Sequence, residues 1–293
     1  MPTTSPAPTI LGIIEPYETA KVVLFGAPYD GTTSYRPGTR FGPGAIRRES
    51  FGLESYSPYQ NADLQDRPVH DLGDLDLPFG GPEAPLAMVK DTVKGILADG
   101  KIPVLLGGEH LVTLGAVEAA FARYPDLCVL HFDAHTDLRD EYIGQTLSHA
   151  SVMRRCLDRL GPGRIWQLGI RSGLRAEFEL GSTGAVWQDA FDLSRLQEAL
   201  EQIGTRPVYL TIDLDVLDPS VFPGTGTPEP GGVGFMDMVC AILDLSGVRI
   251  VGADLVELSP PYDPSGISVM AAGKLLRELL LVLLDGAACE KRA

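Results

Sequence analysis

Positive charge is scarce in this sequence of 293 residues: 24 Lys and Arg stand against 39 Asp and Glu, a formal net charge of −15. Proteins that bind nucleic acid depend on Lys and Arg for contacts to phosphate groups, so nucleic acid is not an expected partner. A negative protein raises the local concentration of small cations, which favours a small cationic ligand. Solubility alone is the commoner explanation of such a charge, because many acidic proteins bind no organic cation.

Cysteine and long apolar runs are also scarce. The four cysteines are Cys128, Cys156, Cys240 and Cys289. Their wide spacing, without any Cys-x-x-Cys pair, indicates free thiols in a reducing compartment. The longest strongly apolar run, at 279–284, is too short to span a bilayer, and the N-terminus lacks the basic and apolar regions of a signal peptide. We therefore expect a cytoplasmic protein that does not associate with a membrane.

No linker interrupts the chain. Hydrophobic residues make up 44% of the sequence, which is enough to bury a large core. Chains of this length with α/β folds often form one domain. We predict a single domain over residues 1–293, in which the proline-rich residues 1–20 form an irregular N-terminal extension.

Short apolar runs alternate with helix-like segments along the rest of the chain. The runs that predict strands are 21–26, 102–107, 127–132, 164–169, 184–186, 207–212 and 249–257, with an edge strand and turn at 69–76. Helices are predicted from 43–44 onward and at 85–99, 113–124, 151–160, 194–203, 235–243 and 268–284. This alternation is typical of an α/β fold with a three-layer, doubly wound and mostly parallel sheet. Such sheets place their functional sites at the carboxyl ends of the strands.

Carboxylates and imidazoles follow several of the predicted strands. They are His110 after a double glycine, Asp133, His135 and Asp137 after the strand at 127–132, Asp213 and Asp215 after the strand at 207–212, and Asp254 and Glu257 at the end of 249–257. A single Asp-x-His-x-Asp motif could be a solvated loop, and a single histidine is more often structural. Recurrence at several strand ends favours one shared site, in which a divalent metal compensates the negative charge.

The residues at the first three strand ends supply four carboxylates and two imidazoles, enough for two metal ions that share bridging carboxylates. The set is rich in oxygen and has no thiolate, which suits a hard, octahedral ion. Mn²⁺ is expected ahead of Mg²⁺, while Zn²⁺ or Co²⁺ stays possible at the histidine-bearing positions. Two such ions about 3.5–4 Å apart generate a nucleophile from water at neutral pH. The pattern therefore predicts metal-assisted hydrolysis.

Four motifs occur in the order and spacing of the ureohydrolases. They are Gly107-Gly-Glu-His110, Asp133-Ala-His-Thr-Asp137, Ser148-His149-Ala-Ser151 and Asp213-Leu-Asp-Val-Leu-Asp-Pro-Ser220. The chain thus resembles the arginase and agmatinase family over residues 26–260. The resemblance implies an arginase-like fold, two Mn²⁺ ions per subunit and a homo-oligomer, either a trimer or a hexamer. It also implies that His110, Asp133, Asp137 and Asp213 bind one ion, and that Asp133, His135, Asp213 and Asp215 bind the other.

The same resemblance implies roles for residues beyond the metal ligands. Glu257 would bind the substrate guanidinium, although an ordinary buried ion pair is its alternative role. Asp137 would pass a proton to the leaving amine, His149 would shuttle protons, and Thr227 would contact the substrate. A scaffold that had lost catalysis would be expected to lack one of these residues or a metal ligand, and all are present. An enzyme is therefore favoured over a non-catalytic metal-binding homologue.

The loop at 138–148 resembles the agmatinase version of the family. We predict cleavage of agmatine to urea and putrescine, a step of polyamine biosynthesis, because Asp140 and Glu141 would repel a substrate carboxylate. Guanidinobutyrase, arginase and formimidoylglutamase activities are the alternatives. Arg139 would favour guanidinobutyrate if its guanidinium faced the pocket, but we expect it to pair with Asp140, Glu141 or another nearby acid.

Overall fold

The computed structural model describes residues 10–289, and the side chains of residues 10–284. Within these residues eight parallel strands form one sheet, in the order β4-β1-β5-β10-β9-β6-β7-β8. In that order the strands are β4 (Val69–Asp74), β1 (Val22–Ala27), β5 (Ile102–Gly107), β10 (Ile250–Val256), β9 (Val208–Asp213), β6 (Cys128–Phe132), β7 (Ile165–Ile170) and β8 (Trp187–Ala190). Every residue of β1, β6, β7, β9 and β10 is buried, as expected for parallel strands covered on both faces.

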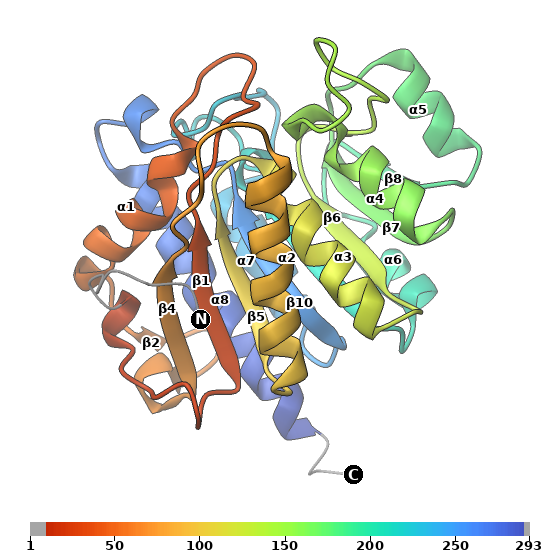
Figure 1. Ribbon diagram of the computed structural model, residues 1–293. Coiled ribbons are helices and arrows are strands. Elements are labelled where there is room, and N and C mark those ends of the chain that lie inside the picture. The colour runs from red at the N-terminus through yellow and green to blue at the C-terminus, as the bar shows by residue number, and fades with distance from the viewer. Residues whose placement is uncertain (1–9, 290–293) are drawn as a thin grey trace.

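Helices cover both faces of this sheet (Figure 1). The helices are α1 (Gly42–Glu49), α2 (Glu83–Ala98), α3 (Thr113–Arg123), α4 (Val152–Leu160), α5 (Arg175–Ser182), α6 (Leu196–Ile203), α7 (Phe235–Asp244) and α8 (Ile267–Cys289). Apolar side chains of α2, α3 and α4 pack in the core on one face, and those of α1, α6, α7 and α8 pack in the core on the other. The predicted three-layer, doubly wound sheet is confirmed, and its strands are all parallel.

Short elements join the main ones. A small antiparallel hairpin pairs β2 (Tyr56–Ser57) with β3 (Ala62–Asp63). Three 3₁₀ helices follow strands or loops that carry candidate site residues: η5 (His110–Val112), η6 (His149–Ser151) and η7 (Leu214–Val216). No helix in the described part of the chain combines the length and the apolar character needed to cross a membrane.

Several sequence-based expectations need correction. The strand predicted at 184–186 begins at Trp187, because Gly184 has a φ of 80° and belongs to a turn. Helix α5 was not predicted. Asp254 lies inside β10 and not at its end, where only Glu257 stands.

The N-terminal extension is irregular in part only. Residues 10–12 form a 3₁₀ helix, and Ile10, Leu11 and Ile13 are buried in the core beneath α1. Residues 1–9 lie outside the described part of the chain. The expectation of free thiols holds for the cysteines whose side chains are described, of which Cys128 and Cys156 are buried and Cys240 is exposed.

Candidate metal centre and adjoining pocket

The carboxyl ends of β5, β9 and β6 bring the first set of candidate ligands together. The Nδ1 atom of His110 lies 3.1 Å from Asp133 Oδ2, 3.3 Å from Asp137 Oδ2 and 3.2 Å from Asp213 Oδ2. All four side chains are buried. Donors at neighbouring corners of an octahedron lie about 3 Å apart when metal–ligand distances are about 2.1 Å. The separations of these donors therefore fit an octahedral ion of that size.

The hydrogen bonds of His110 leave Nδ1 available for such an ion. Its Nε2 lies 3.0 Å from Thr211 Oγ1, and that hydroxyl donates its only hydrogen to Asp254 Oδ1 at 2.6 Å. Nε2 must therefore carry the hydrogen and donate it to Thr211. Nδ1 has no hydrogen-bond partner of acceptable geometry, although three carboxylate oxygens surround it. A cation at this position resolves the conflict.

The electrostatics of His110 agree with this arrangement. Burial opposes a charge on the imidazole, yet the carboxylates of Asp133, Asp137 and Asp213 raise the pKa of His110 well above its usual value. The surrounding acids thus favour positive charge at Nδ1, from a proton or from a metal ion that displaces the proton. Because the oxygens surround Nδ1 without hydrogen-bond geometry, the donor set suits the metal ion better.

A second group of donors lies beside the first and shares Asp133 with it. His135 Nδ1 is 3.0 Å from Asp215 Oδ2 and 3.5 Å from Asp133 Oδ1. Asp133 thus turns one oxygen toward His110 and the other toward His135, which is the arrangement of a bridging carboxylate. Asp213 faces His110 with Oδ2, while its Oδ1 accepts the backbone N–H of Asp215 at 2.9 Å. A bridging role for Asp213 stays a prediction.

His131 makes a contact that the sequence did not reveal. From the sequence, His131 is predicted to be a core residue, because the family pattern gives it no ligand role. It is fully buried, and its Nε2 lies 2.7 Å from Asp133 Oδ2. The spacing of two positions along one strand, which places both side chains on the same face, was the available signal.

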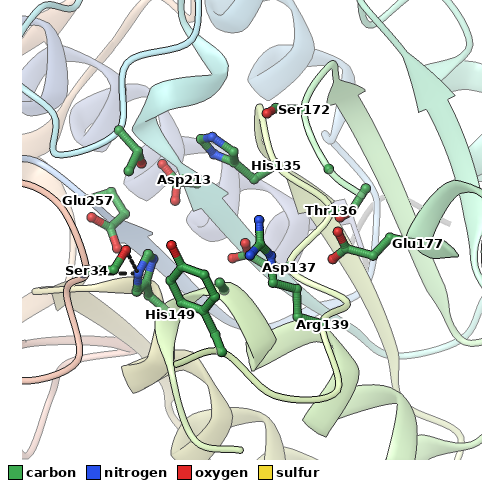
Figure 2. A pocket seen from close by; sticks show the side chains of 14 residues that line it. Ser34, His135, Thr136, Asp137, Arg139, His149, Ser172, Glu177, Asp213 and Glu257 are labelled. Carbon is green, nitrogen blue, oxygen red and sulfur yellow. Dashed lines mark hydrogen bonds between the residues drawn. The ribbon is translucent and has the colours of Figure 1, made fainter. Parts of the chain in front are cut away.

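The two candidate groups border a cavity of about 210 Å³, shown in Figure 2. Its lining includes Ser34, His135, Thr136, Asp137, Arg139, Tyr142, His149, Ser172, Glu177, Asp213, Thr227 and Glu257. In the figure Ser34, His149 and Glu257 lie on one side of the space, and Arg139 and Glu177 lie on the other. Donors for metal therefore form part of the wall of a pocket that could hold a small molecule.

Glu257 stands at the carboxyl end of β10 in a strained conformation. Its φ is +65°, which is costly for a residue with a side chain and is typical of functional positions. Its Oε1 accepts the backbone N–H of His110 at 2.7 Å, and burial raises the pKa of Glu257 well above its usual value. None of the described side chains forms an ion pair with it. The ordinary buried ion pair considered from the sequence is therefore not observed.

His149 faces the same cavity from η6. Its backbone N–H donates to Thr32 Oγ1 at 3.1 Å, and its Nε2 lies 3.0 Å from Ser34 Oγ. Ser34 also donates its backbone N–H to this Nε2 at 3.3 Å, so the nitrogen acts as an acceptor. Burial lowers the pKa of His149 to about 4, and the nearby imidazoles add to the effect. His149 is thus neutral near pH 7, and its Nε2 is an acceptor of hydrogen bonds.

Thr227 and Glu177 complete the wall. The hydroxyl of Thr227 donates to Asp215 Oδ2 at 3.3 Å, which places it beside the second group of donors. Glu177, which the sequence analysis missed, accepts the backbone N–H groups of Leu138 at 2.9 Å and Leu174 at 2.5 Å. It fixes the loop that follows Asp137 to the start of α5. Nothing in the spacing of the motifs pointed to it.

Arg139 does not pair with the acids beside it, contrary to expectation. Its guanidinium lies 4.4 Å from the centre of the Tyr142 ring and borders the cavity. Asp140 instead pairs with Arg155 at 2.8 Å and Arg154 at 3.5 Å, because α4 places both arginines closer to it. The pocket therefore has a cationic group at the end opposite Glu257.

Comparisons with known proteins agree with this geometry. The model of the arginase family matches residues 20–282. An agmatinase of Bacillus subtilis is 46% identical over 268 residues, which cover 90% of this chain and 92% of the relative. Among solved structures, the agmatine ureohydrolase of Thermoplasma volcanium has a TM-score of 0.87 at 39% identity and covers 94% of each chain. The proclavaminate amidino hydrolase of Streptomyces clavuligerus has a TM-score of 0.87 at 32% identity, covering 98% of this chain and all of the other.

Proposed function

Because this chain belongs to the arginase family and is a ureohydrolase, we propose that it cleaves agmatine to urea and putrescine with the help of two Mn²⁺ ions. The observation that carries the proposal is the position of His110 Nδ1 among three carboxylate oxygens, beside a pocket in which Glu257 pairs with none of the described cationic side chains. A cationic substrate beside two metal ions needs an anionic partner. The Glu257 carboxylate can be that partner, and a guanidinium fits a carboxylate.

The residues present fit two divalent ions. We propose that His110, Asp133, Asp137 and Asp213 hold one ion and that Asp133, His135, Asp213 and Asp215 hold the other. When bound, the two ions supply the Lewis acidity that activates water as a nucleophile. The predominance of carboxylate oxygen favours Mn²⁺, since no sulfur ligand is available.

Glu257 is proposed to bind and orient the substrate guanidinium. A buried carboxylate without a cationic partner is costly, so a guanidinium that donates two hydrogen bonds to it gains both charge pairing and direction. The His110 backbone N–H already fixes Oε1 of Glu257 and thereby the orientation of the carboxylate. The substrate carbon would then face Asp137 and the candidate ligands, all of which border the same cavity.

Asp137 and His149 are proposed to move the protons of the reaction. Water adds its oxygen to the guanidinium carbon, the bond from that carbon to the alkylated nitrogen breaks, and this nitrogen leaves as an amine. Asp137 would accept the proton of the attacking water and pass it to the leaving nitrogen. His149, which lines the cavity and has an acceptor nitrogen at Nε2, would exchange protons with the leaving amine. Thr227 would contact the substrate from the side of Asp215.

Arg139 favours one alternative, a hydrolase of guanidino acids such as 4-guanidinobutyrate. Its guanidinium borders the cavity and forms no ion pair with any described side chain, so it could bind a substrate carboxylate. Against this stands the similarity to agmatinases over nine-tenths of the chain.

The deciding experiment measures urea release and kcat/KM for agmatine, arginine and 4-guanidinobutyrate at one Mn²⁺ concentration. We expect agmatine to be preferred by about 10²-fold or more, in line with the agmatinases to which the chain is similar. The variant Arg139→Gln is the internal check, since it should leave that ranking unchanged. A ratio that favours either carboxylate-bearing substrate, lost in Arg139→Gln, would replace agmatine with the alternative.

The metal is tested separately. After chelation we expect activity to be lost, and Mn²⁺ to restore it better than Mg²⁺, Zn²⁺ or Co²⁺. Full activity in a verified metal-free preparation would refute the metal requirement. A cytoplasmic location, a role in polyamine biosynthesis and a homohexamer or homotrimer are further proposals from the family. Light scattering coupled to size-exclusion chromatography tests the last of them.

A further inference from the structure

Both ring nitrogens of His131 make hydrogen bonds inside the sheet. On one side Nε2 lies 2.7 Å from Asp133 Oδ2. On the other, Nδ1 lies 2.9 Å from Nε2 of Gln167, which comes from the neighbouring strand β7. Both His131 and Gln167 are fully buried, so no water competes for these contacts.

The carbonyl of Thr136 fixes the direction of every hydrogen in this chain of contacts. Gln167 Nε2 lies 2.7 Å from that carbonyl oxygen, which can only accept, so the atom must be the amide nitrogen. Its second hydrogen then points to His131 Nδ1, which must accept. The imidazole hydrogen therefore resides on Nε2 and is donated to Asp133. Gln188 supports Gln167 from the edge strand β8 by donating to its Oε1 at 2.9 Å.

This arrangement excludes His131 as a metal ligand. A ligating nitrogen must offer a bare lone pair, whereas Nε2 carries a hydrogen and Nδ1 accepts one from Gln167. What His131 does control is Asp133, whose Oδ1 is held by the backbone N–H of His135 at 2.5 Å. The two hydrogen bonds together fix the rotation of the carboxylate that faces both His110 and His135.

We infer that His131, set in one tautomer by Gln167, is a positioning residue that orients the Asp133 carboxylate so that it can bridge two ions. The inference rests on the proposed metal site. Groups that orient a ligand from behind usually contribute about 10–100-fold to metal affinity. His131 should therefore influence the reaction through the occupancy of the metal site and not through contact with substrate.

The test measures Mn²⁺ binding by the metal-free full chain, by calorimetry or equilibrium dialysis. His131→Phe keeps the ring and removes the N–H, and we expect it to weaken the binding of at least one ion by about 10–100-fold. His131→Gln offers an amide N–H in a similar place and should retain most of the affinity. Val129→Ala, on the same face of β6, is the matched control for lost packing and should bind Mn²⁺ as the wild type does. With saturating Mn²⁺, His131→Phe should regain most of its kcat.

Wild-type affinity in His131→Phe, or an equal loss in His131→Gln and His131→Phe, would overturn the inference. Should His131→Phe not fold, Gln167→Leu provides the test. It removes the contact that sets the tautomer, so affinity should fall several-fold, and an unchanged affinity would be a refutation. Failure of the proposed function is distinguishable, because in that case the wild type itself would bind no pair of ions or release no urea from agmatine.

Discussion

A buried carboxylate inside the sheet, Asp254, and the buried carboxylates at the strand ends differ in what faces them. Asp254, in the middle of β10, accepts hydrogen bonds from the hydroxyls of Thr113 at 2.9 Å, Tyr209 at 2.8 Å and Thr211 at 2.6 Å. Burial raises the pKa of Asp254, while these hydroxyls and the nearby His110 oppose the rise. Such a carboxylate is satisfied without a cation.

Three carboxylates at the strand ends, Asp133, Asp137 and Asp213, accept no hydroxyl hydrogen from the described part of the chain. Asp133, Asp137 and Asp213 each turn an oxygen toward the same imidazole nitrogen, which has no hydrogen-bond partner. Burial of an acid therefore does not by itself mark a metal site. The distinguishing feature is whether hydroxyl hydrogens or the unpartnered Nδ1 of His110 face the carboxylate oxygens.

The largest effect is expected from a substitution in the strand-end group, which comprises His110 and the carboxylates of Asp133, Asp137 and Asp213 that face it. Asp133→Asn removes one charge from the carboxylate that faces both His110 and His135. The Lewis acidity of bound ions is worth several kcal/mol in the transition state, and losing about 4 kcal/mol corresponds to a loss of about 10³-fold in kcat/KM. We expect bound Mn²⁺, measured by elemental analysis, to fall together with the rate. A variant that kept both ions and its rate would contradict the bridging role.

His149→Ala should lower the rate without emptying the site. His149 borders the cavity but contacts none of the candidate ligands through its described hydrogen bonds. Loss of a group that transfers protons typically costs about 10²-fold or more in kcat. The same elemental analysis should find the wild-type amount of Mn²⁺. Loss of an ion would show that His149 supports the metal and that its assigned role is wrong.

The strand-end group could be predicted from the sequence because each of its members follows an apolar run. A parallel sheet collects such residues at one edge, whatever the order of the strands, so local patterns were sufficient for His110, Asp133 and Asp213. The resemblance to a family then supplied roles for residues that spacing alone does not distinguish, such as Glu257 and Thr227.

Asp254 shows why the hydrogen-bond and ion-pair partners of side chains near the site could not be predicted from the sequence. Its spacing from Glu257 looked like another acidic strand end, but its three donors come from α3 and β9, elements far away in the sequence. The orientation of Arg139 depends likewise on Arg154 and Arg155 of α4, which take Asp140 away from it. Which partner a side chain takes is a property of packing between elements, and one sequence does not display it.

Thr211→Val tests the link between Asp254 and the strand-end group. Its effect on Mn²⁺ affinity should be smaller than that of Asp133→Asn. Thr211 donates to Asp254 and accepts the hydrogen of His110 Nε2, so it fixes the tautomer that leaves Nδ1 free. We expect Mn²⁺ affinity to fall by about 10-fold, since the hydrogen bond behind a ligating imidazole is lost. Thr113→Val is the control, because it also removes a hydroxyl from Asp254, whereas the Thr113 hydroxyl makes no described hydrogen bond to the His110 imidazole and its backbone N–H contact to the His110 carbonyl is kept. Equal affinities in the two variants would show that the link has no effect on the metal site.

Tyr209→Phe should have the smallest effect on function and act on stability alone. The hydroxyl of this fully buried ring donates to Asp254 Oδ2, on the oxygen that Thr211 does not use. Its removal leaves the carboxylate with two hydroxyl donors and one less favourable contact in a site that water does not reach. A lost partner of a buried polar group costs about 1–3 kcal/mol, which urea denaturation would register as a lower transition midpoint. Mn²⁺ affinity and kcat/KM should stay at wild-type values, because Thr211 keeps its own contact to Asp254 and thereby holds His110 in the same tautomer. A tenfold loss of Mn²⁺ affinity in this variant would mean that Asp254 supports the metal site together with the strand-end group. The distinction between Asp254 as a structural acid and the strand ends as a metal site would then be wrong.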